Sequence, residues 1–389
     1  MHKLLELPVV KLSEETEKLR EEVRKFISEE LNADSFEPKC DSWLGELSQE
    51  FSRKLGERGW IGMTWPKKYG GHERTAIERF VVTEELLAAG APVAGHWIAD
   101  RQTGPLLLRY GTEEQRQFFL PKIAKGECYF AIGLSEPNAG SDLAGVLTSA
   151  TKVEQGWILN GSKLWSSGAH HAHYMIVLCR TSPQNPENRH QGMSQLLVDL
   201  SANGVTIRPI RLMNGEHHFN EVIFEDVFIS DDMLVGEVGN GWKQGMAELA
   251  YERSGPERFL STFPLLVELV DILQDHTDKR IHIEIGQLAA RLRTLRHMSL
   301  GVASLLQRGV TPDIAAALVK DLGTQFERDV AEIARLLVSP RLTAPSAVHA
   351  PTKYEKRLAE ALLHAPGFTL RGGTTEILRG IVAKGVAAR

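Results

Sequence analysis

Hydrophobic and polar residues follow a helical period in the first third of the chain. Ser13 can cap a helix whose first turn carries Glu14 and Glu15. The apolar residues that follow recur at a spacing that places them on one face of that helix. They are Leu19, Val23, Phe26, Ile27 and Leu31.

A second helix start lies in "GTEEQRQFFL". Thr112 and Gln115 are spaced as a capping box, in which each side chain bonds the other residue's backbone N–H. We expect this helix to end at Pro121, because proline lacks the N–H that continues a helix. These signals predict a helical N-terminal domain.

From about Tyr129 the pattern changes to short runs rich in β-branched and aromatic residues, separated by Gly, Asn, Pro and Ser at roughly ten-residue spacing. This pattern predicts a small antiparallel barrel or sandwich that ends near "LVGEVGNG". The runs are "CYFAIGL", "GWILNGSKLW", "YMIVLC", "SQLLVDL", "VTIRPI" and "EVIFEDVFI".

Long helical periods return after Gly241, in "WKQGMAELAYER" and "IEIGQLAARLRTLRHMSLGVASLL", and the proline-bearing stretch "SPRLTAPSAVHAPTKYEK" predicts a mobile connection. We therefore predict an α+β fold with three domains: an all-α domain over 1–128, an antiparallel β domain over 129–236 and a helical-bundle domain over 237–389.

Composition narrows the class of protein. The 389 residues are 42% apolar and 24% charged, and the net charge of -5 argues against nucleic acid as the main partner. No run reaches the about 18 apolar residues of a membrane span, and the start resembles neither a signal nor a transit peptide, so we expect a cytoplasmic protein. The three cysteines are too far apart to suggest a disulfide framework or a zinc site, and we expect them to be reduced and mostly in the core.

Two glycine-rich segments can bind a ligand. "EPNAGSD" is a turn after a predicted strand, where backbone N–H groups and the hydroxyls of Ser135 and Ser141 can bond a flat heteroaromatic ring and a phosphate. By itself this segment fits a hairpin turn with capping hydroxyls better than a ligand site. In "GGTTEIL", two glycines allow close backbone approach, and Thr374 with Glu376 can cap the next helix.

The segments "LSEPNAGSDLAG", "LNGSKLWSSG" and "RGGTTEILRGIVAKGV" together resemble, in order and spacing, the acyl-CoA dehydrogenase family. "FNEVIFEDVFI" and "LVGEVGNGWKQGM" extend the resemblance over essentially the whole chain. The resemblance implies a C-terminal four-helix bundle, FAD at the junction of the three domains, and a role in fatty acid or lipid metabolism.

The resemblance also assigns cofactor contacts. Ser135 would donate to the flavin ring edge, Ser141 to the pyrophosphate and Ser167 to the N5 region, while Trp165 would pack on the ring face away from substrate. The remaining implied FAD contacts are Leu134, Gly140, Thr374 and Glu376.

The implied reaction removes the α-proton of an acyl-CoA thioester with a base while the β-hydrogen passes as hydride to flavin N5, which gives the trans-2-enoyl-CoA. Many family members carry a Glu where this chain has Gly372. A subset resembling isovaleryl-type, long-chain and bacterial steroid-side-chain dehydrogenases has Gly or Ala there, and a Glu-Arg pair on the helix after the β domain. Here that pair is Glu252 and Arg253, and Gly245 and Leu249 share the helix face of Glu252.

We therefore predict Glu252 as the base and the backbone N–H of Gly372 as the oxyanion donor. The alternative is that Glu252 forms a surface ion pair. The missing side chain at 372 would enlarge the pocket for a branched or bulky acyl group. The resemblance implies substrate contacts from Ser141, Arg253, Arg371 and Gly373, with helix packing an equal alternative for Arg253.

No metal site is expected. His170, His171 and His173 lie close together, but they precede a predicted strand and have no nearby Cys or carboxylate partners. We interpret them as turn and surface residues.

Two family segments are missing. Typical members carry an Arg and a Phe-Gly pair followed by Gln early in the C-terminal domain, and a Gly-Gly-x-Gly segment before the last loop. Here these regions read "LVDILQDHTDKRIHIEIG" and "LLVSPRLTAPSAVHAP". The resemblance implies that the lost groups reach the FAD of a neighbouring subunit. We therefore expect either a hetero-oligomer with a paralogue that supplies them, or a homodimer or tetramer that uses Lys279, Arg280 or Arg291 instead.

Electrons would leave through an electron-transfer flavoprotein. Two other functions stay open: a flavin monooxygenase or oxidase on the same fold, and a non-catalytic subunit of a heteromeric acyl-CoA dehydrogenase.

Overall fold

The structure is a computed structural model, and it describes residues 6–45, 47–252, 254–310, 312–338 and 350–387, of which 247–252 by their backbone alone. The chain divides into two compact units. The first consists of Met1–Gly45, Thr75–Pro92 and Arg253–Arg389, and the second of Glu46–Arg74 and Val93–Glu252. The helices of the first third thus divide between both units. The three-domain division stays a prediction.

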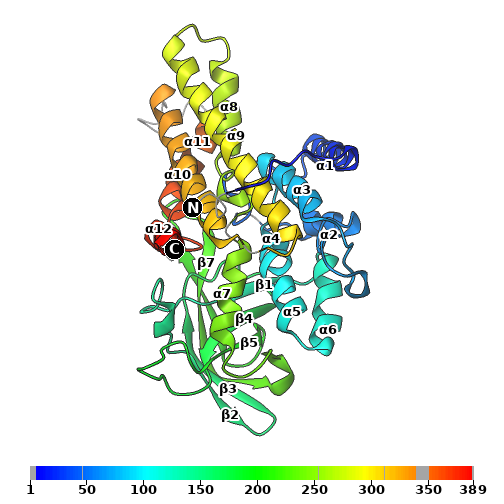
Figure 1. Ribbon diagram of the computed structural model, residues 1–389, viewed down its shortest axis with the longest axis vertical. Helices are drawn as coiled ribbons and strands as arrows, with labels where there is room; N and C mark the ends of the chain where they lie inside the picture. The colour runs from blue at the N-terminus through cyan, green and yellow to red at the C-terminus, as the bar shows by residue number, and fades with distance from the viewer. Residues whose placement is uncertain (1–5, 46, 253, 311, 339–349, 388–389) are drawn as a thin grey trace. The chain divides into compact units, whose positions relative to one another are not determined.

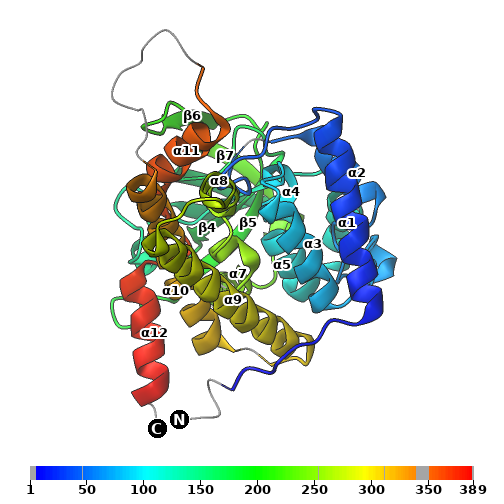
Figure 2. The same cartoon turned by 90° about the horizontal axis from the view of Figure 1, so that it is seen from above.

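The first unit is helical, and the long helix α10 lies at its centre. It packs against α8, α9, α11 and α12, while α1 lies beside α3 (Figures 1 and 2). One side of α10 is buried, and Val319, Phe326 and Val330 are among its buried residues. The helices are α1 (Glu14–Asn32), α3 (Ala76–Ala88), η6 (Pro256–Arg258), α8 (Phe263–Leu273), α9 (Lys279–Gln307), α10 (Asp313–Leu337), α11 (Lys353–Phe368) and α12 (Thr375–Ala387).

Local capping signals place the helix starts correctly. The Ser13 hydroxyl accepts the Thr16 N–H at the start of α1, and the predicted apolar stripe is buried except for the half-buried Leu31. The capping box of Thr112 and Gln115 is also formed. The predicted end at Pro121 is wrong, because α6 continues to Ala124 with the proline inside it. Burial of Ile123 and Ala124 in this last turn offsets the missing backbone hydrogen bond.

The second unit is built on one mixed sheet in the order β6-β7-β3-β2-β4-β5-β8, with β1 also paired to β4 (Figure 1). Most neighbours are antiparallel, as expected, but β2 is parallel to β4 at the one residue pair that joins them, and β1 is parallel to β4 along its whole length. A parallel pair needs a long connection, and the segment between these two strands contains the β2–β3 hairpin. The strands are β1 (Phe130–Gly133), β2 (Ser149–Val153), β3 (Gly156–Lys163), β4 (Tyr174–Arg180), β5 (Met193–Asp199), β6 (Val205–Arg211), β7 (His217–Ser230) and β8 (Leu234–Val235).

The core of this sheet lies on β4 and β5. Every residue from Met175 to Arg180 is buried, as is every residue from Met193 to Val198. By contrast β6 is largely exposed and contains Pro209, which suits a strand at the edge of a sheet. Cys40, Cys128 and Cys179 are free and buried, which confirms that they are core residues.

Short helices complete the second unit. One of them, η3, is a single π-helical turn between α4 and α5. No helix in the described ranges is both long enough and apolar enough to cross a membrane. The helices are α2 (Gln49–Glu57), η2 (Lys67–Tyr69), α4 (Ala94–Ile98), η3 (Ala99–Thr103), α5 (Gly104–Tyr110), α6 (Glu113–Ala124), η4 (Leu143–Gly145), η5 (Asp231–Met233) and α7 (Gly241–Glu252).

Candidate active site

The loop after β1 presents unused hydrogen-bond donors. Glu136 and Ala139 exchange backbone hydrogen bonds of 2.8 and 3.1 Å, which closes a tight turn. Beyond the turn, Gly140 and Ser141 are exposed, while Ser135 is half-buried. Across the described residues, no protein group hydrogen-bonds the hydroxyl of Ser135 or Ser141. Both hydroxyls are therefore available to a ligand.

A buried ion pair holds this loop against β3. The Glu136 carboxylate accepts the Leu147 N–H at 2.6 Å, the Thr148 N–H at 3.0 Å and the Lys163 ammonium at 2.7 Å. Lys163, which is fully buried, also donates to the Leu134 carbonyl at 3.2 Å. Burial alone would raise the pKa of Glu136, but the Lys163 charge and these hydrogen bonds lower it, so the carboxylate is ionised at neutral pH.

Trp165 lies just after β3 in a backbone conformation that is rare for a bulky residue. Its φ is 60°, and the side chain is 54% exposed. Ser166 and Asn220 exchange backbone hydrogen bonds of 3.0 and 3.1 Å beside it, and the Phe219 ring packs edge-on against the indole at 5.8 Å. The protein thus fixes an exposed aromatic plane, and strain of this kind concentrates at functional sites.

The two predicted halves of the flavin loop meet in the structure. The Ser135 carbonyl accepts the Leu164 N–H at 2.8 Å, directly before Trp165. Ser167 is half-buried, and its hydroxyl has no hydrogen-bond partner among the residues placed by the structure. The second unit therefore carries three serine hydroxyls that have no protein hydrogen-bond partner among the described residues, together with one exposed indole.

The histidines near this loop have protein partners. His170 bonds Asn220 at 3.0 Å and stacks on His217 at 3.7 Å, and His173 accepts the Tyr129 N–H at 3.1 Å. Burial, followed by the charges of His171 and His217, lowers the pKa of His170 to about 4, so its ring is neutral at neutral pH. His171 and His173 are exposed, as expected, whereas His170 is half-buried.

The loop before α12 supplies a second set of groups, in the first unit. Gly372 and Gly373 have φ values of 64° and 95°, which only glycine adopts without strain. Thr374 caps α12 through a 3.4 Å bond from the Ile377 N–H, and Glu376 lies exposed in the first turn, which confirms the predicted cap. The Gly372 N–H donates to no protein acceptor in the described part of the chain.

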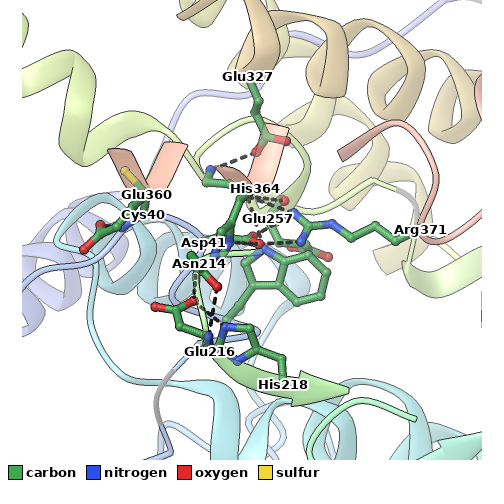
Figure 3. Close-up of polar contacts among 12 residues, drawn as sticks. Cys40, Asp41, Asn214, Glu216, His218, Glu257, Glu327, Glu360, His364 and Arg371 are labelled. Atoms are coloured by element: carbon green, nitrogen blue, oxygen red, sulfur yellow. Dashed lines mark hydrogen bonds and ion pairs between the residues drawn. The ribbon is translucent and has the colours of Figure 1, made fainter. Parts of the chain in front are cut away.

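Two buried charged residues that the sequence analysis did not single out, Asp41 and Lys320, hold the two ends of this loop. The Arg371 guanidinium forms two bonds to the Asp41 carboxylate, of 2.6 and 2.7 Å (Figure 3). The Lys320 ammonium, on α10, donates to the Gly373 carbonyl at 2.8 Å. Burial would raise the pKa of Asp41, but the Arg371 charge and the hydrogen bonds from His364 and Arg371 hold it well below its usual range.

A second buried acid, Glu327 on α10, behaves in the opposite way. One of its oxygens accepts the Ser261 N–H at 2.8 Å (Figure 3), and the other is buried without a hydrogen-bond partner among the described groups. Burial raises the pKa of Glu327 to about 7, although the Arg371 charge opposes the rise. The folded protein therefore holds this proton up to neutral pH.

The raised pKa of Glu327 predicts a loss of stability with rising pH. Between its ordinary value of 4.5 and its folded value of about 7, the folded state binds the proton more tightly than the unfolded state. The free energy of unfolding should therefore fall by roughly 3 kcal/mol from pH 5 to pH 8, relative to Glu327→Gln. Urea unfolding at both pH values measures this difference.

Glu332→Gln is the matched control on the same helix. Glu332 is exposed and hydrogen-bonded to Arg335, and this bond lowers its pKa, so it stays ionised from pH 5 to pH 8. The control should follow the wild-type pH dependence. Parallel profiles for the wild type and Glu327→Gln would contradict the assignment of the proton to Glu327.

The predicted base lies at the end of α7. Glu252 is the last residue of this helix, but its side chain and that of Leu249 lie outside the described residues, as does Arg253. Gly245, which was expected to leave room beside the acid, is buried, and a Cβ added there would meet no atom of the described residues within 4 Å. The role of Glu252 therefore stays a prediction.

Two of the three basic residues that were expected to replace the missing arginine already form ion pairs. Arg280 forms an ion pair with Asp278 at 2.7 Å, and Arg291 pairs with Asp329 at 2.7 Å. Lys279 is exposed at the start of α9. Residues 339–349, which include most of the expected mobile connection, lie outside the described residues.

Family models match the chain nearly from end to end. The acyl-CoA dehydrogenase N-terminal domain matches residues 13–127, the middle domain 131–227 and the C-terminal domain 239–387. Acyl-CoA dehydrogenase IpdE1 of Mycolicibacterium smegmatis is 32% identical, over 96% of this chain and 97% of the relative. Acyl-CoA dehydrogenase FadE26 of Mycobacterium tuberculosis is 30% identical, over 94% and 95% of the two chains.

Solved structures agree with this assignment. A chain of the Tcur3481-Tcur3483 steroid ACAD superposes with a TM-score of 0.86 at 28% identity, covering 97% of this chain and 98% of that one. A chain of the ChsE4-ChsE5 complex from Mycobacterium tuberculosis gives a TM-score of 0.83 at 28% identity, covering 98% and 99%. The chain therefore belongs to the acyl-CoA dehydrogenase family of flavin-dependent oxidoreductases.

Proposed function

We propose that this protein catalyses the FAD-dependent α,β-dehydrogenation of an acyl-CoA thioester, with Glu252 as the base. One observation carries the proposal: the Gly372 N–H has no protein acceptor within the described chain, and residue 372 has no side chain that could act as the base. Such a group is suited to donate to an oxygen that gains negative charge in the transition state. Position 372 therefore supplies a donor, and the acid must come from elsewhere.

The residues of the second unit fit a flavin. The unpartnered hydroxyls of Ser135, Ser141 and Ser167 match the hydrogen-bonding edge and phosphates of FAD, and the exposed Trp165 offers a plane for the ring. At Gly140 an added Cβ would meet nothing within 4 Å in the part of the chain that the structure describes, so the backbone there is open to a ligand. Bound FAD supplies the acceptor for the β-hydrogen.

The chain's own residues handle the proton and the developing charge. Glu252 takes the α-proton, and the Gly372 N–H donates to the thioester oxygen as enolate charge forms. We propose that Ser141, Arg253, Arg371 and Gly373 contact the substrate, with Leu134, Gly140, Thr374 and Glu376 on the cofactor. The bidentate Asp41 pair limits Arg371 to an indirect contact, unless the substrate displaces this partner.

We further propose a branched or steroid-like acyl group as the substrate. Gly372 carries no side chain, and a Cβ added at Gly245 would meet no atom of the described residues within 4 Å, so neither position by itself obstructs a bulky acyl group. A related structure of 28% identity is described as a steroid ACAD. Anaerobic bleaching of the flavin by a panel of linear, branched and steroid-like acyl-CoA thioesters tests this. Bleaching would rule against a monooxygenase, and its absence in fully flavin-loaded protein would overturn the proposal.

Flavin content should depend on a partner. We expect the protein purified alone to hold well under one FAD per chain, and co-expression with a paralogue that carries the missing Arg and Gln to restore full occupancy. The lost arginine contact is worth about 1.5–3 kcal/mol, or ten- to a hundredfold in affinity, and Arg280 and Arg291 already pair with carboxylates. Absorbance and protein concentration give the ratio of flavin to chain.

The flavin content of the variants Arg280→Ala and Arg291→Ala distinguishes a hetero-oligomer from a homo-oligomer. In the heteromer neither substitution should change flavin content. A large loss of flavin in either variant, or full occupancy of the protein alone, would instead support a homo-oligomer. The known ChsE4-ChsE5 complex shows that a relative of this chain forms a heteromer.

The electrons should pass to an electron-transfer flavoprotein. A dehydrogenase whose flavin stays reduced after the product forms needs an external acceptor, and this carrier is the one that we propose. After bleaching with substrate, added electron-transfer flavoprotein should restore the oxidised spectrum much faster than air does. Faster recovery in air would indicate an oxidase.

A further inference from the structure

The loop that carries Gly372 is closed by one backbone hydrogen bond, from the Thr375 N–H to the Thr369 carbonyl at 3.3 Å, but its two glycines are not fixed by backbone hydrogen bonds of their own. Two consecutive glycines with positive φ have more accessible backbone states than any other residue pair. Within the described residues, neither Gly372 nor Gly373 donates a backbone hydrogen bond to the protein. The direction of the Gly372 N–H is therefore set by contacts made to its neighbours in sequence.

The first contact is on the N-terminal side. The Arg371 guanidinium binds both oxygens of Asp41 and also donates to the Ser261 hydroxyl at 3.3 Å. It lies over the Trp43 ring at 4.4 Å and the Phe368 ring at 5.0 Å. A planar guanidinium with a two-point carboxylate contact and two ring faces has one orientation only.

Asp41 itself is fixed. Its side chain is 3% exposed, and its backbone N–H donates to the Ser261 carbonyl at 2.7 Å. Its φ of 58° is uncommon outside glycine, and aspartate is among the residues that tolerate it best. His364 adds a 3.1 Å contact to the carboxylate (Figure 3). The segment around residue 41 thus serves as a rigid support for a loop about 330 residues later in the chain.

The second contact is on the C-terminal side. Lys320 is fully buried in the middle of α10, and its ammonium donates to the Gly373 carbonyl at 2.8 Å. Burying an ammonium is unfavourable unless it is well paired, so a lysine that only filled space here would be replaced at little cost by an apolar residue. Its position at the carbonyl next to Gly372 indicates a role in orienting the loop.

We infer that Asp41, acting through Arg371, and Lys320 are positioning residues that hold the Gly372 N–H toward the thioester oxygen from both sides. This inference rests on the proposed function, because it needs the Gly372 N–H to be the oxyanion donor. Neither residue contacts the reacting atoms. Together they supply the preorganisation that an oxyanion donor needs to act in the transition state.

Asp41→Asn and Lys320→Met test this inference. Each should lower kcat by about ten- to a hundredfold, because a displaced oxyanion donor loses part of the roughly 10²–10³-fold effect of such a group. KM for the acyl-CoA should stay within about threefold, since the donor acts mainly on the transition state. In flavin-free protein, the amide hydrogens of the segment 369–378 should exchange faster in both variants than in the wild type.

Glu84→Gln is the matched control. Glu84 forms an ion pair with Arg296 of 2.6 and 2.9 Å that joins α3 to α9 in the same unit, and it is also buried. The control should lose comparable stability without faster exchange of segment 369–378 and without a lower kcat. If Asp41→Asn does not fold, Arg371→Lys keeps the charge but removes the two-point contact, and should show the same faster exchange of segment 369–378 and the same fall in kcat.

Unchanged exchange in the variants, or an equal fall in kcat in the control, would overturn the positioning role. The exchange experiment needs neither flavin nor substrate, which keeps the two proposals separate. If wild-type protein with full flavin is not bleached by any thioester while exchange rises in the variants, the dehydrogenase proposal fails and the positioning of the loop stands.

Discussion

Glu252→Gln should lower the turnover of the flavin-loaded enzyme at least about a hundredfold, because it removes the group that takes the α-proton. Glutamine keeps the size of the side chain and its place at the end of α7, so FAD content should stay at the wild-type level. The loss should appear equally in kcat and in kcat/KM, as expected for a contact made in the transition state. The rate of anaerobic bleaching measures the chemical step directly.

Two further variants make this prediction specific. Glu237→Gln removes an exposed carboxylate that bonds Asn240 just ahead of α7, and should leave the rate unchanged. Gly372→Glu in the Glu252→Gln background places a carboxylate where many family members carry one, and should restore part of the activity. A full restoration is not expected, because a side chain at φ 64° costs roughly 1–2 kcal/mol. A Glu252→Gln enzyme with near wild-type rates would contradict the assignment of the base.

The elements found from the sequence are those with local signals. Ser13, Thr112 and Thr374 cap helices through residues within three or four positions, so their side chains and the backbone they bond are visible in one short window. The strand β2 was missed because only Ala150 of its five residues is buried, which leaves no apolar alternation. The predicted helix end at Pro121 was wrong because burial of the last turn of α6 outweighed the backbone hydrogen bond that proline cannot form.

The flavin and loop residues were likewise predicted from short motifs, but the groups that support them were not. Asp41 bonds a residue 330 positions away, and Glu136 and Lys163 are 27 apart. A short sequence window does not contain both members of such a pair. The available signal was weak: Lys163 is the single charged residue in "GSKLW", which suggests a buried partner, whereas Lys320 in "ALVKDL" stands next to Asp321 and carries no such signal.

Lys163→Met should destabilise the second unit by about 3–5 kcal/mol, since it leaves the buried Glu136 carboxylate without its counter-ion. The two backbone N–H groups of Leu147 and Thr148 remain as its partners. The Leu134 carbonyl also loses its donor, which frees the loop that carries Ser135. We therefore expect both a lower urea midpoint and faster loss of FAD on dilution, measured by flavin fluorescence.

The control is an exposed lysine–carboxylate pair in the same unit. Lys152 contacts Asp231 at 2.6 Å, as short as the buried pair, but both side chains are about half exposed. Lys152→Met should cost less than about 1 kcal/mol and leave FAD release unchanged, because solvent screens exposed pairs. The double variant Glu136→Gln/Lys163→Met should recover part of the stability, since it removes the uncompensated charge. It should not recover FAD retention. Methionine cannot donate to the Leu134 carbonyl, and the single side-chain oxygen of glutamine cannot replace the two carboxylate oxygens that accept the Leu147 and Thr148 N–H groups. Recovery of both properties would show that charge balance alone, and not the position of the loop, determines flavin binding.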